Sequence, residues 1–339
     1  MSAVDLPEKD WRFIFLFGVH RSGSTWVGKI FDSHPQTLYR HEPDTFSELP
    51  KIPWVTDMAQ TEACREEVER FLNSLPEDQT SFIAGSLPVF HKTYRSKWQD
   101  SAHLLSVMAA KIGRRLSWKI SVHPYADYAS VNGLPVVWKS ICSLTRLGVL
   151  LRVARPSKAV ILLRHPCAVI ASQARGREQG YLRTNPSKHF GFFGTLLDTI
   201  PGKKFGITVD DLRGMEPEER LAWRWILTYE KAIDDIAGFE GDVLIIRYED
   251  ICADPKTWSQ KMFEHCGLPW HSQTEAFLKQ STSDAGRRIA PRVLRSDYFS
   301  IFKDPMVSAT KWRRELEPEK IERILRIMER SSVARLYLS

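Results

Sequence analysis

The sequence predicts an α/β fold in which a mostly parallel sheet is covered by helices on both faces. Short apolar runs alternate with helical patterns along most of the chain, and parallel strands need such crossover segments between them. The first apolar run leads directly into a turn rich in Gly and Ser and then into a helical pattern. The chain has 339 residues, of which 43% are hydrophobic and 26% are charged, so it can bury a large core.

Five short runs predict strands because each is rich in aliphatic or aromatic residues. They lie at residues 12–18, 117–122, 136–139, 158–164 and 242–247. A helical pattern follows the first run to about residue 32, and others lie at 62–75, 101–115, 144–154, 166–177, 218–237, 256–266 and 318–329. Tryptophan is large and mostly apolar, so we expect the core to contain Trp118, Trp138, Trp223, Trp225 and Trp258.

We interpret residues 1–339 as a single domain. Its core spans about 12–280, and a C-terminal segment of about 281–339 follows. Residues 176–215 are rich in Gly, Pro and aromatic side chains, which favours a long surface insertion. Long loops of this kind often contact a ligand, so we expect this insertion beside a binding site.

Charge and cysteine content narrow the classes of protein. The chain has 48 Lys and Arg against 41 Asp and Glu, a formal net charge of +7, and these charges are spread along it. This balance suits a polyanionic small molecule as well as nucleic acid, and charge alone does not separate the two. The sequence has no recognition helix, RNP motif or dense basic stripe, so we expect no nucleic-acid partner. No run approaches the roughly 18 apolar residues of a membrane span. The first ten residues lack a signal-peptide core, so we expect a cytoplasmic protein. Five separated cysteines, with no CxxC pair, predict neither a disulfide framework nor a zinc site.

The turn at residues 18–25 has the composition of a phosphate-binding loop. It reads Gly-Val-His-Arg-Ser-Gly-Ser-Thr, between a strand and a helix. Amide groups at a helix N-terminus favour a phosphate, and glycine lets a ligand approach the backbone closely. A Walker A loop would have Lys where Ser24 stands, so an ATP–Mg²⁺ site is disfavoured. A tight turn without a ligand is the simpler alternative for this segment alone.

Four blocks of sequence, at residues 21–26, 159–172, 245–250 and 311–314, together resemble the sulfotransferases that use 3′-phosphoadenosine 5′-phosphosulfate (PAPS). Residues 29–35 and 41–43 are similar to the carbohydrate and tyrosyl-protein branches of that family. The resemblance implies a P-loop-like fold and a PAPS site that requires no metal. The chain departs from the family pattern at His165, where Asp is usual, and at Cys167, where a basic residue is usual.

The resemblance also implies which residues bind the nucleotide. The 5′-phosphosulfate would contact the loop residues Arg21, Ser22, Gly23, Ser24 and Thr25, and Trp26 would stack on adenine. Arg164 and Ser172 would hold the 3′-phosphate, with Arg175 as a further cation one turn along the helix. The remaining candidates are Tyr248, Ser296 and Lys311. Each has a simpler alternative as a packed or solvated side chain.

Glu42 is the candidate general base, because the matching Glu in the resembling branches removes the acceptor proton. A neutral hydroxyl is a poor nucleophile, and a positioned carboxylate can activate it. Arg21 would then stabilise the charge on the leaving oxygen. His20, His41 and Asp44 are rival bases.

The resemblance therefore implies a sulfotransferase, an enzyme that moves the sulfuryl group of PAPS to a hydroxyl or amine of an acceptor. Carbohydrates and small metabolites are candidate acceptors, but no motif at residues 76–135 or 176–215, the segments expected to select the acceptor, identifies it. The alternatives are a P-loop kinase and a non-catalytic protein that binds a nucleotide or nucleic acid.

Overall fold

The computed structural model describes residues 11–46, 52–78, 80, 82–115, 131, 133–182, 186–283, 301–302 and 304–337. Five strands form one sheet in the order β2-β3-β1-β4-β5. Their bounds are β1 Phe13–Gly18, β2 Leu38–His41, β3 Val136–Ser140, β4 Ser157–Leu163 and β5 Val243–Arg247. Every pairing is parallel. This arrangement confirms the predicted α/β class.

The position of β1 at the centre of the sheet explains why its sequence is an uninterrupted apolar run. All six residues of β1 are buried, because β3 and β4 flank it and helices cover both faces. Phe13, Phe15 and Phe17 pack into one core, while Ile14 and Leu16 pack into the other. This alternation is the two-residue period of a strand, so β1 joins the two cores of the molecule.

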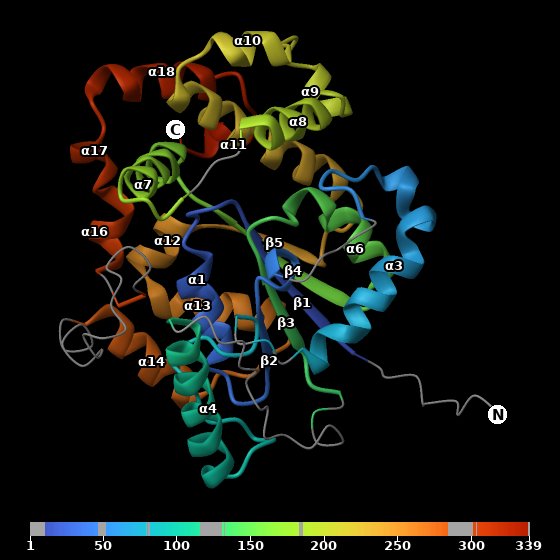
Figure 1. Cartoon of the computed structure of the whole chain (residues 1–339), viewed down its shortest axis with the longest axis vertical. Coiled ribbons are helices and arrows are strands. Elements are labelled where there is room, and N and C mark those ends of the chain that lie inside the picture. The colour runs from blue at the N-terminus through green and yellow to red at the C-terminus, as the bar shows by residue number, and fades with distance from the viewer. Residues whose placement is uncertain are drawn as a thin grey trace.

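Helices form a layer on each face of the sheet (Figure 1). The core that contains the β1 phenylalanines is covered by α3 Thr61–Ser74, α6 Leu147–Val153, α7 Pro166–Glu178, α8 Pro186–Leu197, α11 Pro217–Asp235 and α18 Pro318–Met328. The opposite core is covered by α1 Ser24–Asp32, α12 Tyr248–Ala253, α13 Pro255–His265, α14 Ser272–Thr282 and α16 Pro305–Thr310. The remaining helices are α2 Pro43–Phe46, α4 Lys97–Arg115, α9 Ile200–Lys203, α10 Val209–Gly214 and α17 Trp312–Glu315.

The predicted elements agree closely with these bounds. Four of the five predicted strands are β1, β3, β4 and β5, and each predicted helix has its counterpart. The predicted strand at 117–122 and Trp118 lie outside the described residues. Trp138, Trp223 and Trp225 are fully buried, as predicted, whereas Trp258 packs at the edge of a core. The division of the chain into one domain of three parts stays a prediction.

The expectation of a long loop at 176–215 is wrong. The described part of this segment contains α8, α9 and α10, and α8 and α9 pack against α11. Phe193, Leu196 and Leu212 are fully buried there. Glycines at 191, 194 and 202 interrupt the apolar spacing in the sequence, so the helical periodicity was hidden.

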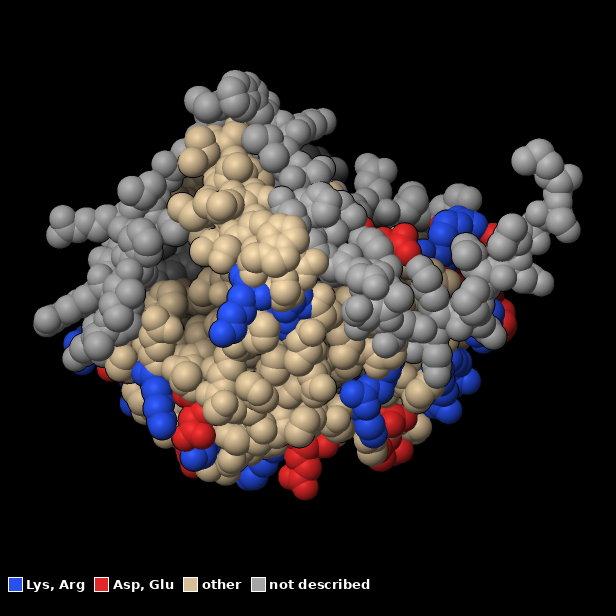
Figure 2. Space-filling view, turned by 90° about the horizontal axis from the view of Figure 1, so that it is seen from below, with Lys and Arg blue, Asp and Glu red and all other residues tan. Residues whose placement is uncertain are grey.

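Positive and negative side chains are interspersed on the face seen from below Figure 1. Figure 2 shows Lys and Arg beside Asp and Glu over the described part of that face. This agrees with the even spread of charge in the sequence. Within the described ranges, no helix is both long and apolar enough to span a bilayer.

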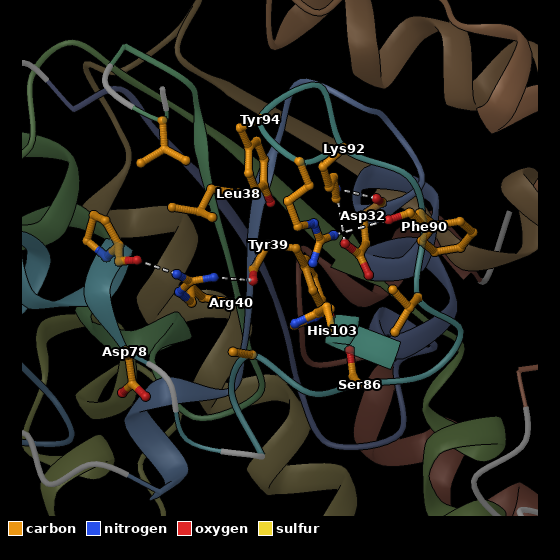
Figure 3. Close-up of a pocket in the computed structure, with 15 residues that line it drawn as sticks. Asp32, Leu38, Tyr39, Arg40, Asp78, Ser86, Phe90, Lys92, Tyr94 and His103 are labelled. Carbon is orange, nitrogen blue, oxygen red and sulfur yellow. Dashed lines mark hydrogen bonds and ion pairs between the residues drawn. The ribbon is translucent and has the colours of Figure 1, made fainter. Parts of the chain in front are cut away.

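A buried ion cluster joins Lys29 and Asp32, at the end of α1, to Lys92, and Figure 3 shows Asp32 and Lys92 of this cluster. The Asp32 carboxylate lies 2.7 Å from Lys29 Nζ and 3.2 Å from Lys92 Nζ. Lys29 also donates to the carbonyl oxygens of Ser86 and Pro88. Burial opposes ionisation of Asp32, but the two ammonium groups hold the pKa of its carboxyl below the ordinary value. The cluster therefore holds together a segment that precedes β2 in the chain and a segment that follows it.

Replacing Lys92 with Met should lower the free energy of unfolding by about 2–5 kcal/mol, because it removes one of the two cations beside the buried Asp32 carboxylate and leaves the carbonyl oxygens of Asp32 and His34 without this donor. Urea denaturation measures this change. The matched control is Lys320→Met, since Lys320 pairs with Glu317 at the surface and such pairs contribute about 0–1 kcal/mol. Equal effects of the two substitutions would show that the cluster has no special structural role.

Candidate active site

The carboxyl ends of the strands open into a cavity of about 750 Å³. A residue at or just beyond the end of each strand lines it, namely Arg21 after β1, Glu42 after β2, Lys139 in β3, Arg164 after β4 and Tyr248 after β5. Ligands of parallel α/β sheets bind at this edge. The cavity is therefore the candidate active site.

Most of the residues singled out in the sequence meet in this cavity. Its lining includes Arg21, Gly23, Ser24, Thr25, Trp26, Glu42, Arg164, Ser172, Arg175, Tyr248 and Lys311. Ser22 does not line it, because its side chain is fully buried beneath the loop, against Gly18. Ser296 lies outside the described residues. The ligand contacts of these residues stay predictions.

Gly23 allows the loop and Tyr248 to come together. Its φ is 91°, in the left-handed region, and a Cβ built on it would lie 2.2 Å from Tyr248 Cε2. Trp26 packs edge-on to the same Tyr248 ring, and its Nε1 donates to Ser281 Oγ at 3.0 Å. The loop, α12 and α14 are thereby joined around the start of α1.

The substitution Gly23→Ala should therefore lower the melting temperature and weaken nucleotide binding. A left-handed non-glycine residue costs about 1–2 kcal/mol, and the contact with Tyr248 adds to this. Gly238→Ala is the matched control, because Gly238 has the same φ of 91° and no atom within 4 Å of its added Cβ. Equal melting temperatures for the two variants would contradict a role for the Tyr248 contact.

Three arginine side chains line the cavity together with Ser172. Arg21 Nε donates to Ser172 Oγ at 3.0 Å, and Arg175 Nη2 lies 3.4 Å from the same oxygen. Arg164 donates to the carbonyl oxygens of Arg21 at 2.8 Å and Ser308 at 2.6 Å, and it lies 4.7 Å above the Tyr248 ring. Within the described ranges, Arg164 Nε has no hydrogen-bond partner. The donor set is that of an anion site.

The Glu315 carboxylate pairs with two cations of the cavity lining. Glu315 in α17 pairs with Arg175 and, at 3.1 Å, with Lys311. Arg175 and Lys311 thus share one carboxylate at the edge of the cavity. A bound anion with two or more charges would compete with Glu315 for both cations.

Glu42 lies across the cavity in contact with Lys139. The Lys139 ammonium pairs with the Glu42 carboxylate, and the Glu42 amide donates to the Lys139 carbonyl oxygen at 2.8 Å. Lys139 is a site residue that the sequence analysis did not name. The available signal was a charged residue ending a run of buried apolar residues, at the strand end where ligands bind.

The rival bases differ from Glu42 in their surroundings. Burial, followed by nearby Arg224, Lys139 and Arg21, lowers the pKa of His20 to about 3. Burial and Lys139 also hold the pKa of His41 well below its ordinary value. Both imidazoles are thus weak proton acceptors near neutral pH.

Asp44 has a structural position. Its carboxylate accepts hydrogen bonds from Ser140 Oγ at 2.5 Å, Ser143 Oγ at 2.7 Å and Trp138 Nε1 at 3.4 Å. It is not among the described residues that line the cavity. Position therefore separates Asp44 from Glu42, whereas His20 and His41 line the same cavity and differ from Glu42 in their lowered pKa values. Glu42 as the general base stays a prediction.

The backbone is strained at two residues of the cavity lining, Arg21 and Glu42. Arg21 has a φ of 71° and Glu42 a φ of 49°, and within the described chain they alone among non-glycine residues have positive φ. Such conformations cost about 1–3 kcal/mol each and occur often at functional sites. Both strained residues line the same cavity.

The two departures from the family pattern lie away from the cavity lining. His165 stacks on Trp312 at 4.4 Å, and its Nδ1 accepts from the Cys167 amide at 3.2 Å at the start of α7. Its own amide donates to Glu249. Cys167 is fully buried in the core. His165 therefore caps the start of α7, and Cys167 packs in the core.

Comparisons with known proteins were made for the sequence and the structure. Residues 14–200, more than half of the chain, match the model of the sulfotransferase family. Carbohydrate sulfotransferase 2 of Homo sapiens is 22% identical over 92% of this chain, which spans 62% of the human protein. The corresponding protein of Mus musculus is 24% identical over 49% of this chain and 32% of its own length.

Solved structures give weaker similarities. The sulfotransferase domain from the Synechococcus PCC 7002 olefin synthase aligns with a TM-score of 0.46 and 16% identity, covering 96% of this chain and 98% of that domain. Mouse sulfotransferase SULT7A1 complexed with PAP aligns with a TM-score of 0.44 and 13% identity, and the alignment covers 96% of this chain and 87% of the mouse chain. The identification rests on the family model, which matches the first strand, the loop and the Arg164–Ser172 block, and by that match the chain belongs to the sulfotransferase family.

Proposed function

We propose that this protein transfers the sulfuryl group of PAPS to a hydroxyl or amine of an acceptor. The main support is the strained backbone of Arg21 and Glu42, since both line one cavity at the strand ends. Membership of the sulfotransferase family supports the same reaction.

The cavity suits a nucleotide with anionic groups at separate positions. Ser24 and Thr25 begin α1, where amides have no acceptor within the helix, and both residues line the cavity beside Arg21. We assign the 5′-phosphosulfate to this end. Arg164, Ser172, Arg175 and Lys311 would hold the 3′-phosphate, for which the free Arg164 Nε offers a donor. Trp26 and Tyr248 supply aromatic surface for adenine.

In the proposed mechanism, Glu42 accepts the proton of the acceptor as its oxygen or nitrogen attacks sulfur. The new bond to sulfur forms in line as the bond from sulfur to the bridging phosphate oxygen breaks, by analogy with phosphoryl transfer. Arg21 and the loop amides stabilise the negative charge on that oxygen. Lys139 holds the Glu42 carboxylate in position.

The first test is a thermal melt with adenosine 3′,5′-bisphosphate, the nucleotide product. A ligand at 100 times its Kd adds about 2.7 kcal/mol of stability. We expect a clear rise in melting temperature with the bisphosphate and a smaller one with ATP–Mg²⁺. A preference for ATP–Mg²⁺ would support a kinase, and no response to either ligand would contradict the proposed function.

A further inference from the structure

A second cavity of about 310 Å³ adjoins the active site beneath the loop that follows β1. It lies between α7, α8 and α11 and is closed on another side by the segment around Trp54. Its volume is near the lower end of the range of about 300–1,000 Å³ found for small-molecule sites. It is therefore large enough to hold part of a ligand.

The two cavities meet at the residues that separate them. His20 and Ile141 line both. Cys142 lines the second cavity, and its Sγ lies 3.7 Å from His20 Nε2 and 3.7 Å from Thr45 Oγ1. The Thr45 amide in turn donates to the Glu42 carbonyl oxygen at 3.0 Å. The second cavity thus adjoins the turn that carries the candidate base.

The lining of this cavity is mostly apolar and aromatic. Among the described residues around it, Arg224 is the one charged side chain and no carboxylate is present, while the apolar surface comes from Val169, Leu221, Trp54, Phe192 and Trp225. The Arg224 guanidinium lies 5.1 Å over the Phe192 ring. The other polar groups of the lining are Thr145, Gln173 and Thr228, with His20 and Cys142 at the boundary with the main cavity. Thr145 Oγ1 and Gln173 Nε2 already donate to the carbonyl oxygens of Trp54 and His20. A sugar buried here would lose water from several hydroxyl groups and find fewer replacement partners than it has hydroxyl groups. A ring with few polar groups would lose few hydrogen bonds to water on entering the cavity.

The walls are held in place by contacts outside the cavity. Arg146 packs 4.3 Å from the Trp54 ring and donates to the carbonyl oxygens of Ile52 and Pro53. Trp225 Nε1 donates to the Arg164 carbonyl oxygen at 3.1 Å. These contacts favour a preformed site, which lowers the entropic cost of binding.

We propose that the second cavity holds the body of the sulfate acceptor, and that this body is an apolar, ring-bearing skeleton carrying the reactive hydroxyl. The hydroxyl would reach past His20 and Ile141 into the main cavity, where Glu42 accepts its proton. This inference rests on the proposed function, and it narrows the acceptor to an alcohol or phenol rather than a polyol.

The test measures binding of 2-naphthol to the full chain by calorimetry, with and without adenosine 3′,5′-bisphosphate, and compares N-acetylglucosamine as a polyol. Val169→Phe fills the cavity from α7, and Trp54→Ala removes an aromatic side chain at its mouth. Trp98→Ala is the matched control, because Trp98 is 67% exposed on α4, Trp54 is 49% exposed, and Trp98 does not line the cavity. We expect each cavity variant to weaken 2-naphthol binding by about tenfold and the control to leave it unchanged.

The outcomes separate this inference from the proposed function. Retained stabilisation by the bisphosphate shows that a variant is folded, so Trp54→Ala still tests the cavity if Val169→Phe fails to fold. The inference is overturned if the bisphosphate binds but 2-naphthol does not, if neither cavity variant weakens 2-naphthol, or if N-acetylglucosamine binds more tightly. If the bisphosphate itself fails to bind, the proposed function falls, and 2-naphthol binding to the free protein still tests the cavity.

Discussion

Replacing Arg164 with Ala is expected to weaken binding of adenosine 3′,5′-bisphosphate by roughly 100-fold or more. Two hydrogen bonds between charged groups contribute about 1.5–3 kcal/mol each, and about 2.7 kcal/mol corresponds to a factor of 100. The substitution also removes the hydrogen bonds to the carbonyl oxygens of Arg21 and Ser308, which hold the loop and α16 beside the cavity. Calorimetric titration with the bisphosphate measures the effect.

Two further variants separate charge from geometry at Arg164. Arg164→Lys keeps a positive charge but loses the planar fork of donors, so it should recover only part of the affinity. Arg326→Ala removes an exposed arginine that pairs with Glu322 in α18, and it should leave affinity unchanged. If Arg164→Ala binds the bisphosphate as the wild type does, the nucleotide lies elsewhere.

The second large effect is expected for Glu42→Gln, which should lower kcat by roughly 10²–10⁴. Glutamine has nearly the same shape, but it does not accept a proton near neutral pH. Affinity for the bisphosphate should stay within about twofold, because a general base acts on the acceptor rather than on the nucleotide. Release of bisphosphate from PAPS, with an acceptor that the wild-type protein uses, measures kcat.

Asp44→Asn is the comparison for this variant. Asp44 is buried with three hydrogen-bond donors, so its substitution should lower the melting temperature and leave the turnover of folded protein largely intact. Glu42→Gln should leave the melting temperature largely unchanged and lower the turnover. Near wild-type turnover in Glu42→Gln would remove Glu42 as the base, and loss of turnover in folded Asp44→Asn would point to Asp44.

The parallel sheet could be predicted because its strands are buried on both faces. β1 and β4 are almost wholly apolar, and such runs are visible without any partner. The strand β2 was missed because it has four residues, Leu-Tyr-Arg-His, which form no apolar run. Its polar residues are satisfied by tertiary contacts, such as Arg40 with the Leu75 carbonyl oxygen.

The candidate site was predictable where local sequence carries its geometry. Gly23 lies in the loop and Trp26 in the first turn of α1 that follows it, while Arg164 directly follows β4 and Ser172 lies in the next helix, so short motifs predict their proximity. Lys139 contacts a residue 97 positions away, and no local pattern indicates that contact. The second cavity is assembled from six separate segments. The roles of all these residues stay predictions until the variants are measured.

The position of β1 in the sheet has a consequence for synthesis of the protein on the ribosome. Phe13 pairs with Val136 on one side and with Ser157 on the other, so both partners are translated more than 120 residues later. At roughly 5–20 residues per second, β1 waits about 6–25 s for its first neighbour. During that interval the nascent chain presents an apolar hexapeptide with unpaired backbone groups. Chaperone availability and translation speed should therefore govern the yield of folded protein.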